Sequence, residues 1–304
     1  MAEQLYIECS AGISGDMLVA ALLDVGADEA AVLAALGSLP MDGFSIRVSR
    51  VAKQGIDACD FDVVLDEAHQ NHDHDMAYLH GHAHGGEGEG PHDAPSAGHH
   101  HEHGHGDGAH RHPRAHGHQG EVAPVHAHAS HEHRNLADVL AIIDAGSMPE
   151  GARRVARRIF EVLAEAEAKA HGRPVGQVHF HEVGAVDSIA DIVAIAVAFD
   201  SLGVHEVVVP RLVDGMGTVR CQHGIIPVPV PAVANIAQAH RIALSIAPVE
   251  GELVTPTGAA VVAALRTSDR LPERFAIKRV GLGAGKRDYA TSGILRAMLI
   301  EPGE

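Results

Sequence analysis

The chain has 304 residues with a formal net charge of −17, and it contains 26 histidines, three cysteines and no tryptophan. Its length and its apolar content of 46% are sufficient for one large or two ordinary domains with a hydrophobic core. An acidic chain without a basic stripe is unsuited to binding nucleic acid through phosphates, and the sequence shows neither a signal peptide nor an apolar run of the ~20 residues that a bilayer requires. Because the cysteines are widely spaced and form no CxxC pair, we expect a cytoplasmic protein without a disulfide framework or a thiolate zinc site.

Residues 1–68 are predicted to form an ordered α/β part that opens with a strand, a turn and a helix. The strand covers about 5–9, and apolar residues at helical spacing then continue until Gly26. A second helix should begin after Asp28, which is a favourable N-cap residue, and end near 36. Two strands are then expected from the alternating apolar residues at 44–48 and from the apolar run at 61–65.

Histidine is concentrated in one segment, which we predict to be a disordered metal-binding insertion. Residues 69–133 hold 20 of the 26 histidines, with 11 glycines, nine acidic residues and almost no branched apolar residues. Such a composition cannot bury enough surface to offset the entropy of ordering. Repeated His-x-His units offer neutral imidazoles that bind Ni, Cu or Zn without a preformed site, so the segment suits a metal reservoir, and an inert linker is the alternative. The densest units contain His99, His101, His103 and His105.

Residues 134–304 are predicted to complete the α/β domain. After a helix that starts near 136, Ser147 and Glu150 have the spacing of a capping box for a long helix, which Gly172 should end. An extended piece at 178–181 leads into an apolar helix that Asp187 should cap and Gly203 should end.

The strand candidate 206–210 follows that helix and favours a βαβ unit with a right-handed crossover. Two further helices should start near 231 and 256, and two strands should flank the glycine-rich turn 281–285. Alternating strands and helices predict an α/β fold with a mixed sheet, interrupted by the disordered His-rich insertion.

The strand-to-helix junction after 178 offers the most metal-like set of ligands outside the insertion. His179 and His181 point to one face of an extended chain, and Asp187 and Asp191 share one face of a helix. Together with Glu182 they could bind a divalent cation. Asp191 favours this interpretation, because a carboxylate buried on an apolar helix requires a charged partner. The alternative is structural, with Asp187 as an N-cap and the histidines bonded to the backbone.

Two turns could hold a phosphate, although each signal is weak. Gly12, Ser14 and Gly15 stand between a strand and a helix, where free amides attract anions, and Asp16 would then require a bridging metal. A second cradle could include Thr255, Thr257 and Gly258. A tight turn without a ligand is the alternative in both places.

Five segments in this order resemble the nickel insertion proteins of nickel-pincer cofactor biosynthesis, the LarC family. They read ECSAGISGDMLVAALLDVGAD, VHFHEVGAVDSIADIV, HGIIPVPVPAV, ELVTPTGAA and GLGAGKRD, and the resemblance covers nearly the whole ordered chain, from about 5 to 296. It implies an enzyme of the lyase class that inserts Ni(II) into pyridinium-3,5-bisthiocarboxylic acid mononucleotide. The product serves lactate racemase and related apoenzymes, and hydrolysis of CTP with a divalent metal drives the step.

Longer members of the family carry a further ferredoxin-like domain for the nucleotide, and in some members a separate polypeptide supplies it. The chain is therefore expected to be a nickel insertase or its N-terminal component, and a homo-oligomer. We expect Asp16, Glu182 and Asp187 to act in catalysis and His179, His181 and Asp191 to bind the metal. The alternative function is a non-catalytic nickel store whose fold anchors the His-rich segment.

Overall fold

The structure, a computed structural model, describes residues 3–67, 76–79, 134–180 and 185–303. The described residues all belong to one compact unit. Six of the predicted site residues lie outside the described residues. They are His181 and Glu182, and the predicted ligands of the insertion, His99, His101, His103 and His105.

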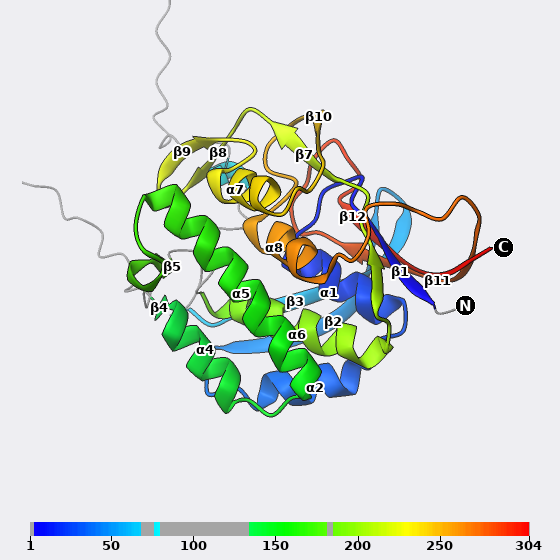
Figure 1. Ribbon diagram of the computed structural model, residues 1–304, viewed down its shortest axis with the longest axis horizontal. Coiled ribbons are helices and arrows are strands. Elements are labelled where there is room, and N and C mark those ends of the chain that lie inside the picture. Colours follow the sequence, from blue (N-terminus) through cyan, green and yellow to red (C-terminus); the bar gives the residue numbers. More distant parts are fainter. Residues whose placement is uncertain (1–2, 68–75, 80–133, 181–184, 304) are drawn as a thin grey trace, which may run out of the picture. The chain divides into compact units, whose positions relative to one another are not determined.

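A six-stranded mixed sheet, in the order β2-β3-β11-β12-β1-β6, forms the centre of the described unit (Figure 1). β1 pairs in parallel with β6 and antiparallel with β12, and β11 pairs antiparallel with β12 and in parallel with β3. Four strands, β1, β3, β6 and β11, therefore run in the same direction, and their carboxyl ends lie at one edge. Their bounds are β1 Gln4–Glu8, β2 Phe44–Lys53, β3 Ile56–Leu65, β6 Glu206–Val208, β11 Phe275–Ala284 and β12 Ile294–Pro302.

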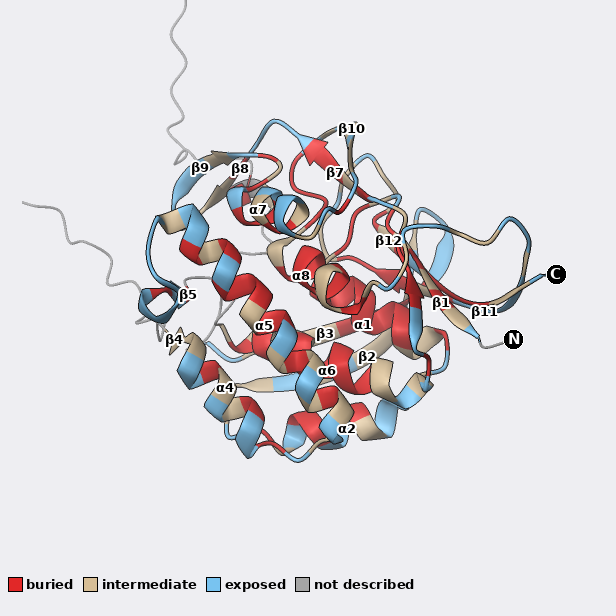
Figure 2. Cartoon of the chain, in the orientation of Figure 1, coloured by how far each residue is buried: buried red, intermediate tan, exposed pale blue. Residues whose placement is uncertain are grey.

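Helices cover one face of this sheet in successive layers. α1 (Gly15–Asp24) packs on β11, β3 and β12, and α6 (Val186–Leu202) packs behind it against α1, α2 and α5. α1 comes close because β11 has glycine where it passes: a Cβ on Gly283 would lie 1.9 Å from the Met17 carbonyl oxygen. Figure 2 shows buried residues concentrated on α1, α6 and α8. The remaining helices are α2 Glu29–Gly37, α3 Met76–Leu79, α4 Leu136–Ala145, α5 Glu150–His171, α7 Pro231–Ala239 and α8 Pro256–Leu265, with a 3-10 turn at Val175–Gln177.

Three smaller ladders surround the main sheet. β7 pairs in parallel with β10, β4 pairs antiparallel with β5, and β8 and β9 form an antiparallel hairpin. Their bounds are β4 Arg134–Asn135, β5 His179–Phe180, β7 Leu212–Met216, β8 Thr218–Cys221, β9 Gly224–Pro227 and β10 Leu244–Glu250. In the described part of the chain, no helix is long and apolar enough to cross a membrane.

Most of the locally encoded helix ends are confirmed. Asp28 caps α2 by accepting a hydrogen bond from the Ala31 amide at 3.0 Å. Gly172 and Gly203 end α5 and α6 in the left-handed conformation, with φ of 61° and 65°. The α/β class and the mixed sheet are likewise confirmed.

Three predictions around α5 and α6 are wrong. Ser147 does not cap α5, because the helix starts at Glu150 with Pro149 at the N-cap position; the Ser147 amide donates to Ser38 Oγ at 2.7 Å. Asp187 is not the N-cap of α6: Ala185 holds that position, so Asp187 lies inside the first turn. The expected βαβ unit also fails, because β5 pairs with β4 in a separate sheet while β6 pairs with β1.

Candidate active site

Three carboxylates meet where α1 and α6 begin, beside the edge at which β1 ends. Asp16 lies in the first turn of α1, and Asp187 and Asp191 lie one turn apart in α6. The helices touch at Gly15, where a Cβ would lie 2.4 Å from Asp191 Oδ2. Ligands of α/β proteins commonly bind outside the carboxyl ends of the strands, which is where this carboxylate cluster, Asp16, Asp187 and Asp191, is found.

Oxygens of this cluster are shielded from water, and burial disfavours the charged form of a carboxyl group. Asp16 is only 8% exposed, and among the described residues Asp16 Oδ2 and Asp191 Oδ1 are buried without a hydrogen-bond partner. Burial, followed by the nearby charges of Asp16 and Asp187, raises the pKa of Asp191 well above its usual value. The positive ends of both helices offset part of the repulsion, but a helix terminus is equivalent to only about half a charge.

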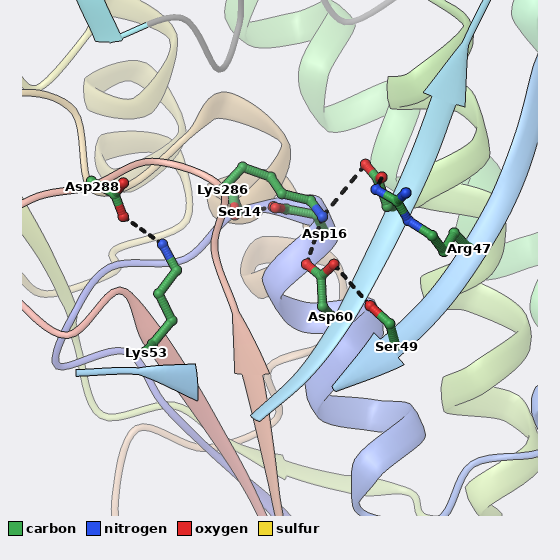
Figure 3. Close-up of polar contacts among 9 residues, drawn as sticks. Ser14, Asp16, Arg47, Ser49, Lys53, Asp60, Lys286 and Asp288 are labelled. Atoms are coloured by element: carbon green, nitrogen blue, oxygen red, sulfur yellow. Dashed lines mark hydrogen bonds and ion pairs between the residues drawn. The ribbon is translucent and has the colours of Figure 1, made fainter. Parts of the chain in front are cut away.

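The ammonium group that acts on Asp191, that of Lys286, is also engaged by other carboxylates. Lys286, which follows β11, places Nζ 2.5 Å from Asp60 Oδ1 and 3.4 Å from Asp62 Oδ1 on β3 (Figure 3). The hydroxyl of Ser49 also donates to Asp60, at 3.3 Å. Lys286 lowers the pKa of Asp191 less than burial and the neighbouring aspartates raise it. Among the described residues, the site therefore combines several carboxyl groups with an ammonium group that they share, which is an arrangement that a cation could stabilise.

Asp60 and Asp62 were missed by the sequence analysis. The signal that could have found them is their period of two on a strand, which places both carboxylates on one face of the sheet. What the pattern could not reveal was the partner, because Lys286 is 226 residues away from Asp60 in sequence.

The turn before α1 is held mainly by protein atoms. The Gly12 amide donates to Cys9 O at 3.2 Å, the Ile13 amide donates to Leu253 O at 2.9 Å, and the Ser14 hydroxyl donates to Asp16 Oδ1. These groups therefore already have acceptors within the fold. Only the amides of the first turn of α1 keep the open geometry of a helix N-terminus, so the phosphate-binding role of Gly12, Ser14 and Gly15 stays a prediction.

The second predicted cradle packs against that same turn. Thr255 caps α8 by accepting from the Gly258 amide at 3.2 Å, and Thr257 is buried. A Cβ on Gly258 would lie 2.4 Å from Ile13 O, so glycine permits the two turns to touch. The structure thus brings both predicted turns together, and it uses Thr255 and Gly258 in the contact.

Asp214 stabilises this pair of turns through hydrogen bonds to the backbone. It is fully buried, and Oδ1 accepts hydrogen bonds from the amides of Gly215, Leu253 and Val254 at 2.8, 2.9 and 3.0 Å. Burial raises the pKa of Asp214, and the three amides work in the opposite direction. Because Leu253 O in turn accepts from Ile13, Asp214 indirectly positions the start of α1.

His179 lies on a strand of a small separate sheet, whereas the carboxylate cluster lies on α1 and α6. Its strand, β5, pairs with β4 at Asn135, and its side chain is exposed. Among the residues that the structure describes, no group of three or more His, Cys, Asp or Glu side chains is arranged so that it could hold a metal ion. Asp187 and Asp191 lie together beside Asp16, and the metal-binding and catalytic roles of these aspartates and of the histidines stay predictions.

Comparison with known proteins assigns the chain to a family. A family described as nickel insertion protein matches residues 5–304. The chain belongs to the nickel insertion protein family. It is 46% identical over 303 residues to the pyridinium-3,5-bisthiocarboxylic acid mononucleotide nickel insertion protein of Alkaliphilus metalliredigens, which covers 99% of this chain and 61% of that relative.

Proteins of the same name from Acetivibrio thermocellus and Staphylococcus saprophyticus are 34% and 32% identical to the chain, over 97% and 98% of its length. The chain spans 60% of each of them. No solved structure matches. The resemblance expected from the sequence motifs is thus confirmed at the level of the family.

Proposed function

We propose that this chain takes part in inserting nickel into pyridinium-3,5-bisthiocarboxylic acid mononucleotide, the compound named in its relatives. The observation that carries the proposal is that three carboxylates, those of Asp16, Asp187 and Asp191, meet at the start of two helices, with Asp16 and Asp191 oxygens shielded from water. Both reactants complement this cluster, because the nickel ion and the pyridinium ring are cations and the helix N-termini beside the cluster suit the phosphate.

The carboxylates also suit the proton chemistry of insertion. Forming a nickel–carbon bond at the pyridinium ring displaces the ring proton, which a nearby base has to accept. Burial, followed by the charges of Asp16 and Asp187, raises the pKa of Asp191, which favours its protonated form while the site lacks a cation. An entering nickel ion would favour release of that proton. Asp16 and Asp187 are then the carboxylates placed to accept the ring proton, with Glu182 as the third candidate base. His179 and His181 are proposed as further nickel ligands.

The remaining features of the enzyme are also proposals. The expected hydrolysis of CTP with a divalent metal is assigned to the part of the relatives that this chain does not span, whether joined or separate. A cytoplasmic homo-oligomer that supplies racemase-type apoenzymes, and the lyase class of the reaction, rest on the resemblance alone.

Replacing single carboxylates tests the proposal. Asp16→Asn and Asp191→Asn keep the shape of each side chain and remove its charge, so we expect insertion to fall at least tenfold in each variant. The assay supplies nickel, the mononucleotide and CTP to the full chain together with the C-terminal part of a relative, and it follows the nickel complex by absorbance and mass. Asp269→Asn, at a side chain that is 62% exposed, serves as the matched control. Unchanged insertion in both cluster variants would contradict the proposal.

The alternative function, a nickel store without a catalytic step, predicts a different result from the same assay. A store would bind nickel but would yield no nickel complex above the rate without protein, in the parent chain as in the variants. Turnover that depends on Asp16 and Asp191 separates the two functions.

A further inference from the structure

A second group of metal-binding side chains lies at the tip of the β8–β9 hairpin, outside the carboxylate cluster. Cys221 pairs with Gly224, so Gln222 and His223 form the turn. The Cys221 Sγ lies 3.7 Å from His223 Nδ1, and the His223 amide also approaches the sulfur, at 3.4 Å. The turn therefore holds a thiol and an imidazole next to each other.

The C-terminus of α5 brings a second imidazole to the same place. The ring of His171 lies 5.0 Å from that of His223, centre to centre, at an angle of 47°. Glu167, one helical turn before His171, places Oε2 3.5 Å from its Nε2. A carboxylate in this position commonly orients a metal-binding histidine through one ring nitrogen and leaves the other nitrogen for the metal.

These separations match those of ligands that share one metal ion. A thiolate at about 2.3 Å and an imidazole nitrogen at about 2.0–2.1 Å from a metal lie about 3.6 Å apart at a tetrahedral angle. Two imidazoles that radiate from such an ion have ring centres about 4.5–5.2 Å apart for angles of about 90–110° at the metal. The observed 3.7 Å and 5.0 Å agree with both estimates.

We propose that Cys221, His223 and His171 form a binding site for a borderline-soft divalent ion such as Ni(II), with Glu167 as a positioning residue. The side chains do not yet enclose an ion as they stand, but His223 is exposed on a two-residue turn and can rotate to close the site. Binding replaces the thiol proton: Cys–SH and M²⁺ give Cys–S–M⁺ and a proton. Such a site, with a vacant fourth position, suits an ion that is received and passed on.

The choice of nickel as the ion, unlike the geometry of the site, rests on the proposed function. The test therefore measures metal binding alone, so that a failure of insertion and a failure of this site are distinguishable.

The experiment titrates Ni(II) into the full reduced chain and records the thiolate-to-nickel charge-transfer band in the near ultraviolet. Histidines elsewhere in the chain cannot produce this band. Burial raises the pKa of Cys9 to about 12 and that of Cys59 to about 11, and both residues are at most 5% exposed, so Cys221 is the cysteine suited to bind. We expect a saturable band whose amplitude corresponds to one thiolate per chain and which disappears in Cys221→Ser.

The imidazole variants complete the test. His223→Ala and His171→Ala should raise the apparent dissociation constant for Ni(II) at least tenfold. Glu167→Gln should raise it by roughly tenfold while the shape of the band is kept. His205→Ala, at an exposed histidine outside the group, is the matched control and should bind like the parent chain. Far-ultraviolet circular dichroism confirms that each variant is folded. Absence of the band in the parent chain, its persistence in Cys221→Ser, or equal titrations of the His171 and His205 variants would overturn the proposal.

Discussion

The carboxylate of Asp191 lies directly on Gly15, so that α6 meets the first turn of α1 without an intervening side chain. A Cβ on Gly15 would be 2.4 Å from Asp191 Oδ2 and 2.9 Å from Asp191 Cβ. This contact brings Asp191 next to Asp16, and the mutual repulsion of the carboxylates follows from it. Glycine at position 15 is therefore a requirement of the site's geometry, whatever ligand the turn binds.

Substitution of this glycine should separate the two helices. We expect Gly15→Ala to lower the free energy of unfolding by about 1–3 kcal/mol, because an added methyl group overpacks the contact. Insertion should also fall, since Asp191 has to move. Urea unfolding and the insertion assay measure the two effects. Gly37→Ala is the control: nothing lies within 4 Å of a Cβ there, and the helix should gain about 0.5–1 kcal/mol. Equal changes in the free energy of unfolding for Gly15→Ala and Gly37→Ala would contradict the close contact between Gly15 and Asp191.

Removing the charge of Asp191 should change how stability depends on pH. Burial and the neighbouring aspartates raise its pKa in the folded chain above the unfolded value, so the folded chain binds the additional proton. Stability from this group is complete below about pH 4 and is lost as the pH rises through the folded pKa. Asp191→Asn should thus be more stable than the parent chain at pH 7, and the difference should shrink towards pH 4.

Chemical unfolding at several pH values in metal-free buffer measures this difference. Asp269→Asn should follow the parent chain at every pH, since that side chain is exposed. A parent chain that is the more stable one at pH 7 would show that the carboxylate is stabilised by a partner, and the raised pKa of Asp191 would then be wrong.

Asp214 should stabilise the fold through its hydrogen bonds more than through its negative charge. Asp214→Ala removes the acceptor of three buried amides, and we expect a loss of about 2–5 kcal/mol in the free energy of unfolding. Asp214→Asn keeps an acceptor oxygen at Oδ1 and should lose clearly less. Urea unfolding compares the two variants. Similar losses in both would mean that the negative charge, rather than the hydrogen bonds to the 253–254 segment, is what the fold requires.

The histidines beside α6 should matter for transfer but little for nickel content. We expect His179→Ala combined with His181→Ala to abolish insertion while most bound nickel remains, because 20 other histidines lie within residues 69–133. Atomic absorption gives the nickel content, and the insertion assay gives the rate. His205→Ala combined with His240→Ala is the control pair. Unchanged insertion would remove His179 and His181 from the mechanism.

Deletion of residues 69–133 separates a reservoir from a catalytic element. We expect the shortened chain to insert nickel at the parent rate when nickel is plentiful, and to fail when nickel is scarce, because the imidazoles only concentrate the ion. The measurement is the insertion rate as a function of nickel concentration. A variant that keeps the length of the segment but has serine for each histidine controls for the loss of chain. Loss of activity at saturating nickel would contradict the reservoir function.

Local chemistry explains which predictions succeeded. The Asp28 cap and the glycine ends of α5 and α6 each depend on a few consecutive residues, and all are confirmed. The Ser147 cap failed: Pro149 holds the N-cap position of α5, and the Ser147 amide donates instead to Ser38, 109 residues away in sequence. A propensity that involves one turn of helix cannot account for an acceptor supplied by another part of the chain.

Composition, periodicity and consecutive motifs were sufficient to predict the α/β class, the mixed sheet and the family, and they locate the histidines in one segment. Which of those residues meet depends on the tertiary structure. The fold places Asp191 on Gly15, pairs Lys286 with Asp60, and brings His171 of α5 to His223, which lies beside Cys221 in a hairpin. Burial raises the free energy of a charge and packing fixes its neighbours, and both depend on contacts between residues that are distant in sequence.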